Sequence, residues 1–376
     1  MEVLDLSQQQ VIDAHCHPCP PRHPQTWEEF CGLFTLRVPR PGREMAAVTP
    51  ILNEQTLLQL ARLFACEPTP EKVMAEHSRR AQDPAAYTRL LMKDANIAGL
   101  VVDFGYPQPP LSPDYWREVA GVKVAEVFRI EPLVQRLLGE CSDFSSFRLR
   151  YREEVAAALS RPVCAGLKSI IAYRSGLGIS LASPEEAAKD FEGGKRGEGG
   201  SLKRLRDWCL LEAMLLCRQF DKVMTIHTGA GDSEIRLETA RPELLYDLLT
   251  TDPFSEVRTV LVHAGYPWCR QAAFMVNVMD NVYLDTSLVS PFSGPGVKAI
   301  LEEILHIAPV EKVMHGSDNF SLPEVGWMGA ILTRAALAAI FGRLVEEGAV
   351  RREYARHAAD RILRGNAVEF FRLAAW

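Results

Sequence analysis

The sequence predicts an α/β protein that folds as a (β/α)8 barrel, also called a TIM barrel. Short apolar runs alternate along the chain with segments of helical periodicity, and eight such runs occur in 376 residues. The length would also accommodate two domains, but barrels of this type commonly exceed the usual domain size. We therefore expect a single domain over residues 1–376.

Composition and charge narrow the class of protein. Hydrophobic residues make up 47% of the chain and charged residues 24%, which is typical of a soluble globular protein. The formal charge of −6 argues against a nucleic-acid-binding surface. The N-terminal residues lack the layout of a signal peptide, and no apolar run approaches the roughly 20 residues that span a membrane. We therefore expect a cytoplasmic protein without a membrane segment, in which the nine cysteines are free and buried.

The predicted strands are short and apolar, and most are followed by a helical segment. Typical examples are GLVVDF, VMTIH and TVLVH. The eight strands are expected over residues 11–18, 99–104, 122–131, 163–171, 223–227, 259–263, 282–285 and 313–315.

Three segments do not fit a plain alternation of strands and helices. Residues 19–96 are too long for a simple connection and are rich in aromatic residues and helix formers, so we expect a helical insertion that forms a lid or a pocket wall. Residues 192–201 are glycine-rich and charged, which predicts a mobile loop. Residues 352–371 carry a helical apolar stripe, which predicts packing on the outside of the barrel.

Two histidines lie one residue apart in the first predicted strand. Successive side chains of a strand point to opposite faces, so His15 and His17 share one face and can reach the same ion, whereas Cys16 points away. Imidazole nitrogen is a common ligand of zinc and similar ions, but two histidines require further ligands from elsewhere in the chain.

Three later residues of suitable type also lie at strand ends. His227 ends the fifth predicted strand, His263 ends the sixth, and Asp318 follows the eighth. Catalytic groups of a (β/α)8 barrel gather at the carboxyl ends of the strands. A single histidine in a strand is more often a core residue, but five such groups at strand ends favour a metal site.

At these residues the sequence resembles the amidohydrolase superfamily of metal-dependent (β/α)8-barrel enzymes. The resemblance covers essentially the whole chain and rests on DAHCH in the first strand, IHTGAG and VHAGYP after the fifth and sixth, and HGSDNF after the eighth. Within the superfamily, the chain resembles the amidohydrolase-related branch that includes nonoxidative decarboxylases. GLKSIIAYRSGL and YLDTSLVSPF are similar to the amidohydrolase-like domain that some larger proteins carry fused to a glutamine-synthetase-like domain.

The resemblance implies that His15, His17, His227 and Asp318 bind a divalent metal ion, with His263 beside it in catalysis. We expect one zinc ion, although manganese or iron would suit the same ligands. A metal held by imidazoles and a carboxylate lowers the pKa of its bound water toward about 7. Asp318 would accept a proton from this water and pass it to the leaving group, and His263 would polarise a substrate carbonyl.

Lys168, near the end of the fourth strand, has two possible roles. In some members of the superfamily a carboxylated lysine at this place bridges two metal ions. If Lys168 is carboxylated, we expect two ions instead of one. We favour an unmodified ammonium that binds a substrate carboxylate, with Arg129 and Arg174 as further carboxylate-binding residues. The purely structural alternative for Lys168 is a buried ion pair with Glu131.

These observations predict a metal-dependent hydrolase that cleaves a C–N bond of amide type in a small, anionic, carboxylate-bearing substrate through a metal-activated water. A second hypothesis is nonoxidative decarboxylation of an aromatic or unsaturated acid by the same metal. A third is a catalytically inactive barrel that serves as a binding module. No nucleic-acid or membrane partner is expected, and a homodimer is the default for the oligomeric state.

Overall fold

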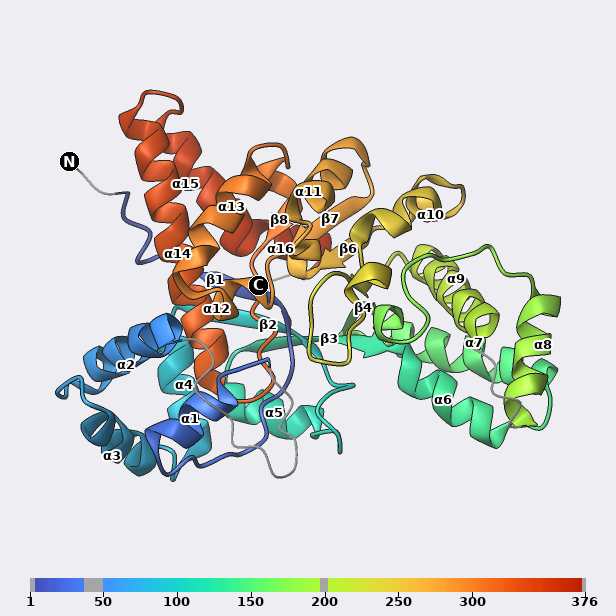
Figure 1. The fold of residues 1–376 in the computed structure, drawn as a ribbon, viewed down its shortest axis with the longest axis horizontal. Helices are drawn as coiled ribbons and strands as arrows, with labels where there is room; N and C mark the ends of the chain where they lie inside the picture. Colours follow the sequence, from blue (N-terminus) through green and yellow to red (C-terminus); the bar gives the residue numbers. More distant parts are fainter. Residues whose placement is uncertain (1–3, 37–49, 197–201, 374–376) are drawn as a thin grey trace.

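The computed structural model describes residues 4–36, 50–196 and 202–373. Eight parallel strands follow one another around the sheet in chain order, which confirms the predicted (β/α)8 barrel (Figure 1). Backbone hydrogen bonds from Ala14 to His315 and from Asp318 to His15 join the first strand to the segment after the last one. The strands are β1 (Val11–Cys16), β2 (Ile97–Asp103), β3 (Lys123–Arg129), β4 (Cys164–Ser169), β5 (Val223–His227), β6 (Thr259–Val262), β7 (Val282–Asp285) and β8 (Val313–Met314).

The predicted strands and the observed strands agree in number and order; β5 and β7 match at both ends, and the others differ by one to two residues at one or both ends. β1 ends at Cys16, so His17 lies just beyond it, and β3 ends at Arg129 because a helix begins at Ile130. The chain leaves the strand conformation where its side chains turn into the pocket. His263 and Asp318 both have a positive φ there, at 70° and 57°.

The described part of the insertion between β1 and β2 contains four helices. Their N-termini are fixed by side chains that accept backbone N–H groups, such as Thr26, Thr69 and Asp83. Buried His77 and Tyr87 both contact Glu324, at 2.9 and 2.7 Å, and so tie the insertion to a helix that follows the last strand. The helices are α1 (Trp27–Leu33), α2 (Pro50–Phe64), α3 (Pro70–Arg80) and α4 (Pro84–Asp94).

A second group of helices projects from the barrel between β3 and β5 (Figure 1). In its interior the ring of Phe147 stacks on that of Tyr151, and the tilted ring of Phe191 packs against Phe147. The predicted loop over residues 192–201 is partly wrong, because 192–195 form the last turn of α8, whereas 197–201 lie outside the described residues. The helices are α6 (Ile130–Glu140), α7 (Phe144–Ser160), α8 (Pro184–Lys195) and α9 (Lys203–Gln219).

The remaining helices cover the barrel. α14 is long and apolar enough to cross a membrane by length and composition alone, contrary to the expectation from the sequence. Its apolar character has another explanation, because Trp327, Leu337 and Phe341 are buried among the barrel and its neighbouring helices. The helices are α5 (Pro113–Ala120), α10 (Tyr246–Thr250), α11 (Cys269–Val278), α12 (Val289–Phe292), α13 (Val297–Leu305), α14 (Pro323–Glu346), α15 (Arg352–Asp360) and α16 (Asn366–Phe370).

The C-terminal segment packs differently from the prediction. α15 lies against α14 on the outside, but α16, after a π-helical segment at Arg361–Gly365, closes the amino-terminal end of the barrel. Phe370 and Phe371 join the cluster formed by inward residues such as Ile12 and Val260. At this end the two apolar rings bury more surface than they would on the outside of the barrel. Because they help to close the amino-terminal end, the carboxyl end is the open face. All nine cysteines are free, as predicted, and eight of them are buried.

Candidate active site

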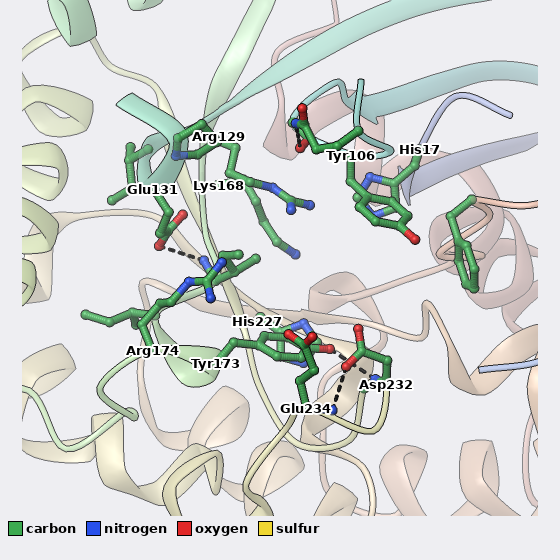
Figure 2. A pocket seen from close by; sticks show the side chains of 18 of the residues that line it. His17, Tyr106, Arg129, Glu131, Lys168, Tyr173, Arg174, His227, Asp232 and Glu234 are labelled. Atoms are coloured by element: carbon green, nitrogen blue, oxygen red, sulfur yellow. Dashed lines mark hydrogen bonds between the residues drawn. The ribbon is translucent and has the colours of Figure 1, made fainter. Parts of the chain in front are cut away.

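A cavity of about 960 Å³ opens at the carboxyl ends of the strands. Every predicted site residue lines it, although these residues are far apart in the sequence. Figure 2 shows His17 and Tyr106 on one side, Glu131 and Arg174 on the other, and Asp232 and Glu234 on the loop after β5. The predicted site residues that line it are His15, His17, Arg129, Lys168, Arg174, His227, His263 and Asp318.

His15, His17 and Asp318 form one compact group. The Nε2 atoms of both histidines lie 3.4 Å from Asp318 Oδ1, and one donor atom from each residue falls within 4.8 Å of the others. His17 Nδ1 lies 2.9 Å from the carbonyl oxygen of Asp103. Since a carbonyl only accepts, Nδ1 carries the proton and Nε2 presents its lone pair to Asp318. Three electron-rich atoms therefore face one another.

Burial keeps the imidazoles of His15 and His227 neutral. Burial, followed by the nearby Lys168 ammonium, holds the pKa of His15 well below its ordinary value. The same two causes lower the pKa of His227. Neutral imidazole is the form that binds a metal ion, so this group has the charge and the geometry of a cation site.

His227 and His263 form a second pair beside this group. His263 Nε2 lies 3.0 Å from His227 Nδ1, and the ring centroids are 4.4 Å apart. His227 is not one of the three residues in the compact group, although the sequence predicts all four ligands together. Within the described part of the chain, the buried His227 Nε2 has no hydrogen-bond partner, as expected of a nitrogen that binds a ligand.

Two residues that the sequence analysis did not identify hold His263. Ser287 Oγ lies 2.8 Å from His263 Nδ1 and also donates to Asp285 Oδ1. Because the single hydroxyl proton of Ser287 goes to the carboxylate, His263 Nδ1 must be the donor, which leaves the lone pair on Nε2. Asp285 ends β7 and Ser287 follows it, so their position at a strand end was the available signal.

Lys168 is buried and lies against the first group, with Nζ 3.1 Å from His15 Nε2. Burial lowers the pKa of Lys168 to about 8. The structure does not contain the ion pair between Lys168 and Glu131 that was considered as an alternative. Glu131 Oε1 instead accepts hydrogen bonds from Ser169 Oγ and from the backbone N–H of Ile170, at 2.7 and 2.8 Å.

The two predicted arginines differ in their surroundings. Arg129 donates from Nε and Nη2 to Asp103 Oδ2, at 2.8 and 2.6 Å, so its charge is compensated within the protein. Arg174 lines the cavity after the short helix Ile171–Tyr173 and forms no ion pair with any described residue. Tyr173 contacts the ring of His227 in an edge-to-face arrangement, with ring centroids 4.6 Å apart.

Comparison with known proteins places this geometry in a family. The amidohydrolase family model matches residues 184–373, which is half of the chain. Protein fluG of Emericella nidulans is 30% identical over 244 residues, covering 61% of this chain. The chain corresponds to only 28% of the length of that relative.

Solved structures show the same fold at lower identity. A crystal structure assigned as a metal-dependent hydrolase, from Lactobacillus casei, has a TM-score of 0.87 and 23% identity, and the match covers 99% of this chain and 98% of that one. Glucuronate isomerase from Caulobacter crescentus has a TM-score of 0.68 and 15% identity, with 100% and 93% coverage. The fold therefore does not by itself select the reaction.

Proposed function

Because this chain belongs to the amidohydrolase family of metal-dependent enzymes, we propose that it hydrolyses a C–N bond of amide type in a small substrate that carries a carboxylate. The observation that carries the proposal is the His15–His17–Asp318 group, which lies in the same cavity as Lys168 and as Arg174, a side chain that has no ion pair with any described residue. Such a cavity can hold a cation and an anionic substrate next to each other.

The donor set fits a divalent ion. His15 Nε2, His17 Nε2 and Asp318 Oδ1 would hold it, and two imidazoles with one carboxylate suit zinc, manganese or iron. We propose zinc, and one ion. When bound, a divalent ion supplies Lewis acidity, which activates water and polarises a carbonyl group. His227, whose buried Nε2 is unpartnered among the described residues, is the additional ligand in this proposal.

Asp318 is the proposed proton carrier. Its Oδ1 contacts both histidines, so Oδ2 is available to accept a proton from water and to return it to the leaving amine. A leaving amine needs this proton, because an unprotonated amide nitrogen is a poor leaving group. The side chain lines the cavity, where a substrate can reach it.

His263 and Lys168 have different proposed roles. Both ring nitrogens of His263 already have partners, Ser287 and His227, so we assign it to orienting His227 while one ion is bound. If two ions were bound, His227, His263 and a carboxylated Lys168 would be available to hold the second one. The unmodified Lys168 ammonium would bind a substrate carboxylate beside His15.

This position of Lys168 also supports a second candidate function. An ammonium 3.1 Å from a metal-binding nitrogen would hold a substrate carboxylate directly at the ion, as nonoxidative decarboxylation of an aromatic or unsaturated acid requires. In that reaction the carboxylate is lost as carbon dioxide, whereas in hydrolysis it is retained.

The test uses the purified full chain loaded with zinc, manganese or iron, and panels of N-acyl amino acids and aromatic acids. Release of amine without carbon dioxide supports the hydrolase, and release of carbon dioxide without amine supports the decarboxylase. If the protein retains no stoichiometric metal and no metal gives turnover with either panel, the chain is a binding module and both enzymatic proposals are wrong.

A further inference from the structure

We infer that Arg174 and Arg206 together bind a carboxylate at the end of the substrate that is remote from the His15–His17–Asp318 group. This inference rests on the proposed function and specifies the part of the substrate that is recognised. Figure 2 shows Arg174 on the side of the cavity opposite His17, with its guanidinium directed into the cavity. Arg206, in α9, was not identified from the sequence and lines the same cavity.

The first argument is the absence of a protein partner. Among the described residues, neither Arg174 nor Arg206 has a carboxylate within ion-pair distance or a side-chain hydrogen bond. Two other arginines of the cavity wall are compensated, because Arg129 is paired with Asp103 and Arg136 with Glu140 and Glu154. Arg22 also lines the cavity without an ion pair among the described residues, but its side chain is exposed. Arg174 and Arg206 therefore differ from Arg129 and Arg136 in having no carboxylate partner within the described chain.

The second argument is that the two unpaired charges are neighbours. Arg206 is half-buried, and burial followed by the charge of Arg174 lowers the pKa of Arg206. A guanidinium nevertheless stays protonated in proteins, so the repulsion is not relieved by loss of a proton. An anion between the two groups would relieve it.

The nearest compensating carboxylate is already engaged. Glu131 raises the pKa of Arg206 through its charge, but its Oε1 accepts from Ser169 and Ile170, and its Oε2 is enclosed. Glu131 thus reduces the repulsion without forming an ion pair with either arginine. The partner that completes the arrangement has to enter through the cavity.

The surrounding wall indicates what connects this carboxylate to the scissile bond. Ile171 and Leu205 line the cavity beside the two arginines, and Val134 and Leu138 of α6 line it nearby. An apolar wall favours a hydrocarbon spacer over a polar one. The substrate class is therefore an amide with a terminal carboxylate on an aliphatic or aromatic arm.

Calorimetry with the full-length, metal-containing protein tests the inference, with glutarate as the probe and glutaramide and inorganic phosphate as comparison ligands. We expect glutarate to bind wild type, and to bind R206Q and R174Q at least about tenfold more weakly, since each loses charge-assisted hydrogen bonds. R204Q is the matched control, because Arg204 lies on the same helix but faces Glu186 on the surface. R206K should lie between R206Q and wild type, because it keeps the charge without the planar fork.

Three results would overturn the inference: equal glutarate binding by R206Q and wild type, glutaramide binding as tight as that of glutarate, or tighter arginine-dependent binding of phosphate. If R206Q does not fold, as judged by circular dichroism, R174Q in the loop after Tyr173 gives the same answer. Binding of glutarate does not depend on turnover. Arginine-dependent binding without amide hydrolysis would therefore reject the proposed reaction and retain the carboxylate site.

Discussion

The cavity contains two neighbouring groups of histidines, and the contacts of their ring nitrogens differ. In the group of His15, His17 and Asp318, lone pairs and a carboxylate oxygen face one another without a hydrogen between His17 and Asp318. In the pair of His227 and His263, one ring can donate to the other at 3.0 Å. No proton lies between His17 Nε2 and Asp318 Oδ1, so a cation would stabilise this contact, whereas a proton already stabilises the contact between His227 Nδ1 and His263 Nε2. The difference supports the proposal that the first group is the primary ion site.

The largest effect is expected from D318N. The amide lacks the charge that attracts the ion and cannot accept the proton, so both metal content and turnover should fall, turnover by at least about 10²-fold. Metal analysis and amine release measure the two effects. D114N is the control, since Asp114 is a 94% exposed carboxylate outside the cavity. A variant D318N with normal turnover would remove Asp318 from the mechanism.

The comparison predicts unequal effects of two histidine replacements. H15A should abolish stoichiometric metal binding, whereas H227A should retain the ion with reduced affinity, because only His15 belongs to the compact group. Metal analysis after extensive dialysis distinguishes the two variants. His306→Ala is the control, because His306 is exposed. Equal loss in H15A and H227A would show that the four residues act as one site.

K168M distinguishes an unmodified lysine from a carboxylated one. For an unmodified ammonium 3.1 Å from His15 Nε2, we expect retained metal and a KM that rises by about 10- to 100-fold for a carboxylate substrate. K222M is the control, because Lys222 contacts Cys164 at the opposite end of β4. Loss of metal in K168M, with a carboxylate adduct on the wild-type lysine in native mass spectrometry, would favour two ions.

The smallest effect is expected from S287A. Without the hydroxyl, the Nδ1–H group of His263 loses its hydrogen-bond acceptor, and the ring is no longer held in one tautomer. Turnover should therefore fall by about tenfold. Nitrogen NMR of the imidazoles should report mixed tautomers for His263. S290A is the control, because Ser290 is equally buried but contacts Thr286. An unchanged tautomer in S287A would show that the serine does not orient the ring.

Sequence reasoning recovered the features that are encoded locally. Apolar runs such as VMTIH predicted the barrel strands, and their last residues predicted the histidines of the site, because parallel strands bring their carboxyl ends together. The free, buried cysteines also followed from composition.

Features that depend on tertiary packing were not predicted. The apolar stripe of α16 could pack equally well on the outside of the barrel or against one of its ends. Only the folded structure shows that Phe370 and Phe371 fill the barrel end. The pattern of β5 cannot reveal that the ring of its last residue, His227, contacts His263. The carboxylate that compensates Arg129 lies 26 residues away, so the sequence did not distinguish it from the unpaired Arg174.

The most direct test of this account is a crystal structure of the zinc-loaded protein with data collected at the zinc absorption edge. The account predicts one anomalous peak bounded by His15 Nε2, His17 Nε2 and Asp318 Oδ1, with an unmodified Lys168 beside it. Absence of a peak at these three atoms, or a peak only between His227 and His263, would contradict it.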